Sequence, residues 1–485
     1  MSAAVSTDVP RFGLFIGGRE QDAAGADALA TVEPATGRSW ATVAAAGTED
    51  VDAAVRGAAS AFPAWRDTLP LERGRILLRI AEGIAAEADR LAELESRDNG
   101  KPLQQALADV AVAARYFEFY GAAADKLHGD SLPLGDGVLA YTRREPFGVV
   151  GAIVPWNLPL NQAARCLAPA LAVGNTVVLK PAEDTSVSSL ALAELAHRHG
   201  LPAHVLNVVP GLGTVAGAAL VEHPLVRKVA FTGSVETGRA VAQAAGGRLV
   251  PTTLELGGKS AHIVFADADL DQAARHAVKA ILLNSGQVCS AGSRLLVEES
   301  VHDELVSRLQ ALFQATADGS AELELGPLTT LEQKKKVERY IELAAEEGAE
   351  VWRPRTDARE GWFVPPAILT KVSNDMTVAQ DEIFGPVLCV IPFRDEAAAV
   401  RIANDSRFGL VAGVCTNDVS RAHRVAAALE VGQVFVNEYF LGGVETPFGG
   451  VKESGYGREK GIAGALEYTS LKTVIVRVDA LPAQR

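Results

Sequence analysis

Residues 147–183 read FGVVGAIVPWNLPLNQAARCLAPALAVGNTVVLKPAE and contain the repeating unit that decides the fold. Two short apolar runs rich in β-branched residues, 149–154 and 176–179, flank a stretch after Leu160 with helical spacing. The pattern continues with apolar runs at 205–209 and 229–232, and with helical stretches after Ser186, Gly213 and Gly238. Strands and helices that alternate at this spacing predict a parallel sheet with helices on both faces.

The same class of pattern extends outward along the chain. Apolar residues recur at helical spacing over 51–125, and a second alternation of apolar runs and helical stretches covers 261–436. A chain of 485 residues also exceeds the size at which one hydrophobic core keeps growing. We therefore predict an α/β fold with two domains. They are a Rossmann-like parallel-sheet domain formed by 1–123 and 147–257, and a second α/β domain formed by 258–453.

Two segments with the pattern of extended strands fit neither domain. They are VLAYTRR at 138–144 and TVIVRV at 473–478. Strands with unpaired edges invite association unless another segment covers them. We predict a small β extension for oligomerisation, formed by 124–146 and 454–485. A sheet shared in a homodimer or homotetramer would cover these strands, and so would packing within one subunit.

Charge and composition limit the classes of partner. The formal net charge is −14, whereas nucleic acid and anionic membranes attract concentrated positive charge. No stretch approaches the roughly 20 apolar residues of a membrane span, and residues 1–10 lack the pattern of a secretory signal. The four cysteines show neither CxxC spacing nor a metal-like cluster. We therefore expect a cytoplasmic protein with free thiols, without a metal, and without a nucleic-acid or membrane partner.

Two glycine-rich turns follow predicted strands and offer places for a diphosphate. The segment PGLGTVA at 210–216 includes Gly213, and FTGSVETG at 231–238 includes Gly233 and Ser234. Free backbone N–H groups at the start of a helix can bind a pyrophosphate in such turns. Each turn alone also fits an ordinary strand-to-helix connection.

The segment VVLKPAE at 177–183 adds a cation and a carboxylate at the end of a predicted strand. Ligands of open α/β sheets bind at the carboxyl edge, where Lys180 and Glu183 would lie. A carboxylate there accepts both hydroxyls of an adenosine ribose and repels a 2′-phosphate. This pair therefore favours NAD over NADP.

Among the four cysteines, Cys289 has a distinctive context. It lies in NSGQVCSAG at 284–292, among small polar residues and glycines, whereas Cys166, Cys389 and Cys415 lie in contexts typical of buried, inert thiols. A thiolate attacks a carbonyl carbon, and the resulting adduct can release a hydride. From this context alone, a structural role for Cys289 is equally compatible.

Two polar side chains complete a possible site for acyl chemistry. Glu255 lies in LELGGK at 254–259, among apolar residues that would raise its pKa and make it a general base. Asn157 lies in the Pro-bounded turn PWNLP at 155–159 and offers an amide donor for an oxyanion. Taken singly, each also fits a structural role at the end of a strand or in a turn.

Seven ordered segments resemble the signature motifs of the aldehyde dehydrogenase superfamily, over a stretch from Phe15 to Val478. They are PWNLP (155–159), KPAE (180–183), FTGS (231–234), LELGG (254–258), GQVC (286–289), EIFGP (382–386) and PFGG (447–450). The resemblance implies that Cys289 attacks the aldehyde and that Asn157, with the Cys289 N–H, forms the oxyanion hole. It also implies that Glu255 activates water to hydrolyse a thioester, which gives a free carboxylic acid.

The resemblance extends to a proton path and to the cofactor. Glu459, in GRE at 457–459, resembles a carboxylate that some members use to pass protons to the general base; a solvated loop residue is the alternative. FTGS becomes the pyrophosphate turn, and the turn with Gly213 moves toward the adenine side. The expected NAD-binding residues, with NADP as a possible second cofactor, are Trp156, Lys180, Glu183, Gly213, Gly233, Ser234, Glu382 and Phe384.

The aldehyde is less well defined by the sequence. By resemblance, the helix after Pro159 lines the substrate tunnel, which gives Gln162 and Arg165 to its wall. Semialdehyde and lactaldehyde-type enzymes of the family carry an arginine at the position that matches Arg165, which favours a polar or acidic aldehyde. The alternative is that Arg165 pairs with a carboxylate of the protein. Leu283 stands where a second arginine would strengthen the acidic alternative. Tyr439 and Phe440, in the loop expected to border the tunnel mouth, fit an aromatic aldehyde equally well.

Two rival functions remain at this point. In a CoA-acylating dehydrogenase, coenzyme A would take the acyl group, but such members generally lack the general-base glutamate. A catalytically retired structural member has no chemical reason to keep Cys289, Glu255 and Asn157 together. The sequence therefore predicts an NAD(P)-dependent aldehyde dehydrogenase of the hydrolytic type.

Overall fold

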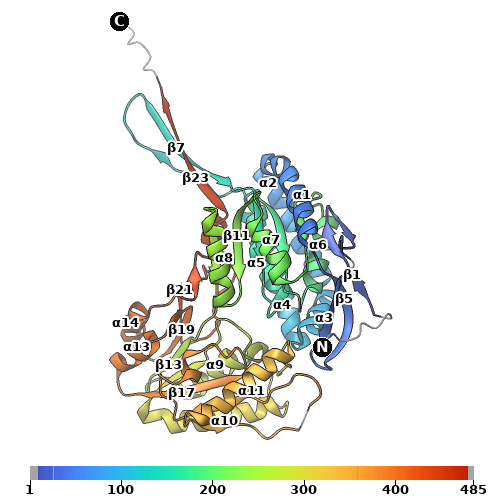
Figure 1. Ribbon diagram of the computed structural model, residues 1–485. Helices are drawn as coiled ribbons and strands as arrows, with labels where there is room; N and C mark the ends of the chain where they lie inside the picture. Colours follow the sequence, from blue (N-terminus) through green and yellow to red (C-terminus); the bar gives the residue numbers. More distant parts are fainter. Residues whose placement is uncertain (1–8, 26, 358, 479–485) are drawn as a thin grey trace.

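A parallel sheet forms the centre of the first half of the computed structural model, which describes residues 9–25, 27–357 and 359–478 (Figure 1). Its parallel strands are β8 (Val149–Ile153), β9 (Thr176–Lys180), β10 (Leu206–Val208), β11 (Val226–Thr232) and β12 (Thr252–Glu255). Antiparallel strands complete both edges: β2 (Leu14–Ile16), β3 (Arg19–Gln21) and β22 (Gly455–Tyr456). The full order of this 8-stranded sheet is β22-β12-β11-β8-β9-β10-β2-β3. The predicted Rossmann-like sheet is confirmed.

Helices cover both faces of this first sheet, because successive strand residues point in opposite directions. Val150 and Val177 join a core with α5 (Pro159–Ala172) and α6 (Val187–Arg198). Their neighbours Val149 and Val178 join a core with helices on the other face. Those helices are α1 (Thr48–Asp67), α7 (Ala218–Glu222) and α8 (Val235–Gly247). Burial on both faces explains why the strands are continuous apolar runs.

The helical stretch expected over 51–125 consists of α1, α2 (Pro70–Ala86), α3 (Ala88–Asn99) and α4 (Leu103–Ala123). The predicted helix after Gly238 begins earlier, at Val235, because Ser234 caps it by accepting a hydrogen bond from the Thr237 N–H at 3.2 Å. The second half of the 210–216 segment belongs to a π-helical turn, Gly213–Gly217, which leads directly into α7. Within the described residues, no helix is long and apolar enough to span a membrane.

A second sheet of 7 strands has the order β15-β16-β17-β14-β13-β19-β20 and confirms the second α/β unit. Its strands are β13 (Ala261–Val264), β14 (Arg294–Glu298), β15 (Glu350–Trp352), β16 (Ala367–Thr370), β17 (Val387–Phe393), β19 (Val411–Cys415) and β20 (Gln433–Val436). Its helices are α9 (Leu270–Leu282), α10 (His302–Ala317), α11 (Leu331–Glu346), α12 (Thr377–Gln380), α13 (Glu396–Asn404) and α14 (Val419–Ala428). Only β15 pairs antiparallel among these strands.

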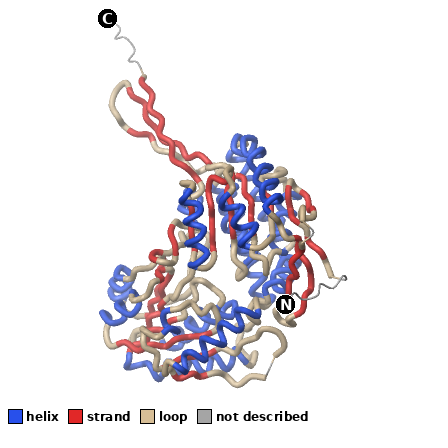
Figure 2. The backbone as a smooth tube through the Cα atoms, in the orientation of Figure 1, coloured by secondary structure: helices blue, strands red, loops and turns tan. Residues whose placement is uncertain are grey.

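The two segments predicted as extended pair with each other. Strand β7 (Val138–Pro146) lies between β6 (Ser131–Leu132) and β23 (Thr469–Arg477) in a 3-stranded sheet that projects from the body (Figures 1 and 2). Of the described part of the predicted extension, residues 454–478, this sheet contains only β23. Strand β22 belongs to the first sheet instead, where Leu254 faces Tyr456.

Short strands near the N-terminus escaped the sequence prediction. Three of them form a separate sheet: β1 (Arg11–Phe12), β4 (Ala28–Glu33) and β5 (Arg38–Ala44). The other two, β2 and β3, lie at the edge of the first sheet. Smaller elements are β18 (Phe408–Gly409), β21 (Val451–Lys452) and α15 (Gly461–Leu466). The predicted domain limits at residues 1 and 485, and most of the segment compared with a secretory signal, lie outside the described residues.

Candidate active site

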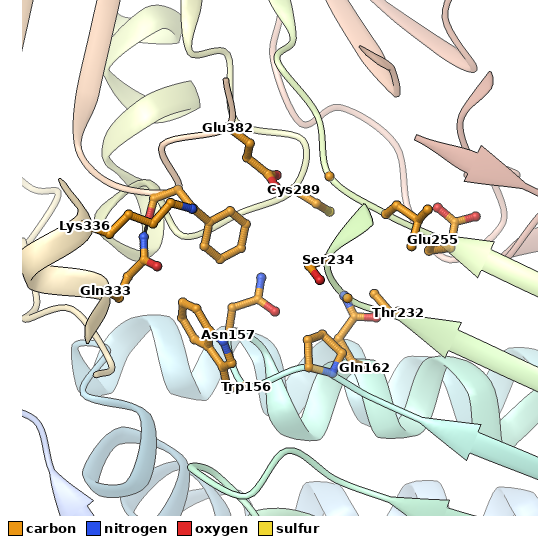
Figure 3. Close-up of a pocket in the computed structure, with 15 residues that line it drawn as sticks. Trp156, Asn157, Gln162, Thr232, Ser234, Glu255, Cys289, Gln333, Lys336 and Glu382 are labelled. Carbon is orange, nitrogen blue, oxygen red and sulfur yellow. Dashed lines mark hydrogen bonds between the residues drawn. The ribbon is translucent and has the colours of Figure 1, made fainter. Parts of the chain in front are cut away.

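The carboxyl ends of the first sheet open into a cavity that residues of the second α/β unit close (Figure 3). Trp156, Asn157 and Gln162 follow β8, Thr232, Gly233 and Ser234 lie at the end of β11, and Glu255 ends β12. From the other side come Cys289, Gln333, Lys336, Glu382 and Phe384. The cavity therefore brings together residues that lie far apart in the sequence, at the edge where α/β proteins bind ligands.

Cys289 follows a sharp kink at the end of α9. Asn284, Ser285 and Gly286 have φ angles of 49°, 55° and 75°, in the left-handed region that is costly for residues other than glycine. The Asn284 amide donates to the carbonyl oxygen of Asn157 at 2.9 Å, and the Ser285 hydroxyl donates to a backbone carbonyl at 2.7 Å. A Cβ at Gly286 would lie 2.1 Å from another carbonyl oxygen. These contacts hold the kink that directs Cys289 toward the cavity.

Tyr439 supports the Cys289 loop from behind. Its side chain is fully buried, and its hydroxyl donates to the carbonyl oxygen of Ser290 at 3.1 Å. Its ring packs against Phe435 and His262 at centroid distances of 5.1 Å. The prediction that Tyr439 lines the tunnel mouth is therefore wrong, because the whole side chain is used in packing and in this hydrogen bond.

All four cysteines are free, and Cys289 is a partly exposed residue, whereas Cys166, Cys389 and Cys415 are buried. Burial raises the pKa of Cys289 to about 11, although the nearby positive charge of Arg165 acts in the opposite direction. At neutral pH the sulfur therefore carries its proton, and a base must remove this proton before the sulfur attacks a carbonyl. The exposure separates this thiol from the other cysteines.

The Asn157 side chain is buried beside the Cys289 loop. Its Nδ2 donates to the carbonyl oxygen of Gln287 at 2.8 Å. An amide nitrogen has two hydrogens, and this is the single donation found for Asn157 in the described part of the chain. The second N–H can therefore donate to an oxygen in the cavity, which is the requirement for an oxyanion hole.

Glu255 is buried at the end of β12, beside the antiparallel strand β22. A Cβ at Gly449 would lie 2.7 Å from Glu255 Oε1, so the PFGG glycine leaves room for this carboxyl group. Burial raises the pKa of Glu255 well above its ordinary value, and the negative charge of Glu459 raises it further. A raised pKa makes this carboxylate, once ionised, a stronger base than an exposed glutamate, as a general base requires.

Glu459 is buried, so the alternative of a solvated loop residue is wrong. Its Oε2 makes an ion-pair contact with Arg165 Nε, while Arg165 Nη2 lies 3.9 Å from Glu255 Oε2. The second distance is that of an ion pair without a hydrogen bond. The sequence allowed Arg165 to pair either with a substrate carboxylate or with a carboxylate of the protein. In the structure its partner is a carboxylate of the protein, Glu459.

The predicted ribose pair is formed at the end of β9. Lys180 Nζ donates to Glu183 Oε2 at 2.7 Å, and the side chain of Glu183 remains 37% exposed. The Gly213 N–H faces the other carboxylate oxygen at 3.4 Å, which brings the 210–216 turn next to Glu183. The carboxylate is thus held in one orientation, with surface left for a ligand hydroxyl.

Three predicted cofactor residues meet at the far wall of the cavity. Trp156 and Phe384 pack edge to face with a centroid distance of 5.3 Å. Glu382 Oε1 accepts a hydrogen bond from the Gly258 N–H at 3.0 Å, and a Cβ at Gly257 would lie 2.3 Å from its Oε2. The glycines of LELGG therefore let Glu382 approach the backbone closely.

Gln333 and Lys336 line the cavity but were missed in the sequence. Gln333 Nε2 donates to the carbonyl oxygens of Ile383 and Phe384 at 2.9 and 2.7 Å, which fixes the EIFGP segment. Both residues lie on α11, in an amphipathic segment that resembles any charged surface helix. The two residues are three positions apart, so both lie on the same face of α11, and only the folded structure shows that this face borders the cavity. Burial there lowers the pKa of Lys336.

Gln162 and Arg165 occupy different positions on α5. Gln162 is buried and lines the cavity. Arg165 lies one turn further along, behind Glu255, and its Cζ lies 4.5 Å from the ring centroid of Phe448. The part of the cavity wall that α5 forms therefore presents the amide of Gln162 rather than an unpaired guanidinium.

Comparison with known proteins agrees with this arrangement. A family model described as "Aldehyde dehydrogenase family" matches residues 21–474. "Aldehyde dehydrogenase family 2 member B4, mitochondrial" of Arabidopsis thaliana is 42% identical over 482 residues, covering 98% of this chain and 90% of its own. An aldehyde dehydrogenase of Aspergillus niger is 43% identical, covering 97% and 96%. The NAD+ complex of an aldehyde dehydrogenase from Bacillus cereus matches with a TM-score of 0.93 and 41% identity, over 97% of each chain.

Proposed function

The chain belongs to the aldehyde dehydrogenase family and oxidises aldehydes with NAD, and from this premise we propose that it forms a free carboxylic acid through a covalent intermediate on Cys289. The observation that carries this proposal is the convergence of Cys289, Asn157 and Glu255 on one cavity. These side chains supply a nucleophile, an oxyanion donor and a general base, which are the groups that acyl chemistry at a thiol needs.

The bond changes follow from these three groups. After loss of its proton to a base, the Cys289 sulfur forms a bond to the aldehyde carbon, and the carbonyl oxygen takes the electron pair. The Asn157 amide donates to this oxygen. After oxidation, Glu255 takes a proton from water, and the water oxygen attacks the thioester carbon. The carbon–sulfur bond breaks, the electron pair returns to Cys289, and the acid leaves.

The residues present fit NAD. Glu183 offers a partly exposed carboxylate, fixed by Lys180, for ribose hydroxyls. The start of α8 at Ser234 offers backbone N–H groups for the diphosphate. When bound there, NAD supplies the acceptor for the hydride that leaves the aldehyde carbon, so that the adduct on Cys289 becomes a thioester. A 2′-phosphate would meet the negative charge of Glu183, which supports NAD over NADP.

The hydrolytic outcome separates this proposal from a CoA-acylating enzyme. We expect wild-type protein, incubated with lactaldehyde and NAD without coenzyme A, to form lactate in a one-to-one ratio with NADH. Proton NMR would identify the product, and absorbance would measure NADH. Absolute dependence of NADH formation on coenzyme A would contradict the role proposed for Glu255.

For the substrate, we propose a polar but uncharged aldehyde. Gln162 offers an amide on the cavity wall, while the charge of Arg165 is already paired with Glu459. A substrate carboxylate near Arg165 would meet the negative charge of Glu459 and, once ionised, that of Glu255. The aromatic alternative loses the support of Tyr439, which is fully buried.

This substrate proposal predicts the order in which the enzyme prefers different aldehydes, as measured by kcat/KM. We expect kcat/KM for lactaldehyde to exceed that for succinic semialdehyde by about tenfold or more, since one unpaired like-charge contact costs at least ~1.4 kcal/mol. Benzaldehyde and hexanal complete the panel, measured by NADH formation at one pH. A clear preference for succinic semialdehyde would contradict the uncharged substrate, and one for hexanal would contradict the polar wall.

We also propose that the 3-stranded sheet is the oligomerisation surface of a homodimer or homotetramer. Its strands β6 and β7 come from residues 124–146, and its third strand is β23. Leu139, Leu471 and Ile475 are exposed on it by 48%, 51% and 64%, an arrangement that a second subunit would cover. The four free thiols support a reducing compartment such as the cytoplasm.

A further inference from the structure

Behind Glu255 lies a buried cluster of charges that the proposed chemistry leaves unexplained. Glu255 and Glu459 are two carboxyl groups, each only 4% exposed, and the Arg165 side chain between them is 6% exposed. Arg165 Nε contacts Glu459, and Arg165 Nη2 is 3.9 Å from Glu255. The single guanidinium group of Arg165 is thus the shared counter-charge of two carboxyl groups that are almost completely buried.

The surrounding structure fixes each member of this cluster. Arg165 projects from α5, and its guanidinium stacks over Phe448. The backbones of Phe448 and Glu459 form an antiparallel bridge with N–O distances of 2.7 and 2.8 Å. This bridge fixes Glu459 directly beside Phe448. A Cβ at Gly464 would lie 2.9 Å from the carbonyl carbon of Glu459, so α15 also packs closely against it. The arrangement leaves Arg165 little freedom to turn toward a ligand.

The charge balance gives this geometry a consequence. Two buried carboxylates that lie close together resist simultaneous ionisation, and an adjacent cation relieves this resistance. Other titratable groups also surround the pair. They are Tyr116 and Tyr120 on α4, Cys166 on α5, Lys228 on β11, Cys289 on its loop, and Arg458, Lys460 and Tyr468 near the chain end. Burial lowers the pKa of Lys460 to about 8, so this lysine is a weaker counter-charge than arginine.

We propose that Arg165 is a positioning residue for hydrolysis of the intermediate, which holds Glu459 in place and provides the positive charge that lets Glu255 ionise beside it. The inference rests on the proposed function of Glu255 as the general base. In that step ionised Glu255 takes one proton from water, the water oxygen bonds to the thioester carbon, and the electron pair of the carbon–sulfur bond returns to Cys289. Arg165 enters no bond change and acts through the charge of Glu255.

The test uses p-nitrophenyl acetate, an activated ester that acylates a nucleophilic thiol directly. The initial burst of p-nitrophenolate measures acylation of Cys289, and the steady-state rate measures hydrolysis by Glu255. For Arg165→Met, which keeps the length of the side chain without its charge, we expect a normal burst. The acidic limb of the steady-state rate should move upward by about one to two pH units.

Three further variants serve as controls for this expected shift. Arg165→Lys keeps the charge and should leave the acidic limb within about half a pH unit of wild type. Glu459→Gln removes the like charge and should move the limb downward. Arg56→Gln alters an exposed ion pair on α1 that does not line the cavity, and should have no effect. If Arg165→Met does not fold, the double variant with Glu459→Gln removes both charges and should have a higher limb than Glu459→Gln alone.

The outcomes separate the two levels of the proposal. A normal burst with an unmoved limb in Arg165→Met, or a rate that falls equally at every pH, would make Arg165 a purely structural residue. Absence of a burst in wild type, or wild-type hydrolysis by Glu255→Gln, would overturn the proposed function and this inference together.

Discussion

Cys289→Ala is expected to lower kcat for every aldehyde by about 10⁴-fold or more, because it removes the only sulfur that reaches the cavity among the described residues. Without a nucleophile, no covalent adduct forms and the oxyanion donor has no charge to stabilise. NADH formation under saturating aldehyde measures the loss. Cofactor binding, followed by quenching of tryptophan fluorescence, should be retained, since Trp156 and the Glu183–Lys180 pair are unchanged.

Cys415→Ala is the matched control for this variant. Cys415 is a buried thiol on β19, 4% exposed, and its loss should leave the activity close to wild type. A Cys289→Ala protein with wild-type turnover would contradict the covalent route. Loss of cofactor binding in the same variant would instead indicate that the kink at 284–286 had collapsed.

Glu255→Gln is expected to separate the oxidation from the hydrolysis. Glutamine fits the same space beside Gly449 but cannot take a proton from water, so the steady-state rate should fall by about 10²–10⁴-fold. A rapid-mixing experiment with aldehyde and NAD should give a burst of about one NADH per active site, followed by slow turnover. In wild type, the rate should rise with pH through the raised pKa of Glu255, because only its ionised form is a base.

The control for Glu255→Gln is Glu304→Gln on the exposed face of α10, which should keep wild-type kinetics at all pH values. Full steady-state turnover in Glu255→Gln would assign the base to another group. A variant without turnover and without a burst would mean that Glu255 is needed before the hydride leaves, for example to take the proton of Cys289.

Local pattern was sufficient for the two α/β units. Strands such as β8 and β9 are buried on both faces, and their β-branched runs have no helical period, so their nature is visible in a few residues. The short strands β1 and β2 carry two or three residues each and leave no such pattern. Ser234 also shows why the start of a helix is hard to locate, because a side-chain cap extended α8 beyond its apolar period.

The candidate site was predictable where motifs end strands, and not where partners meet across the fold. Asn157, Glu255 and Cys289 lie at positions whose local sequence is unusual, and they converge as expected. The partner of Arg165 lies nearly 300 residues further along, at Glu459, and no local signal announces the contact. Tyr439 resembles any loop aromatic, and only the packing around Ser290 identifies it as a support of the nucleophile loop.

The most direct measurement of the central claim is the mass of the intermediate. Glu255→Gln, mixed with lactaldehyde and NAD and quenched in acid within the burst, is digested and examined by peptide mass spectrometry. We expect a lactoyl group on the peptide with Cys289, attached to its sulfur and removed by hydroxylamine. An unmodified Cys289 after a full burst of NADH, or a lactoyl group on another residue, would contradict the covalent mechanism.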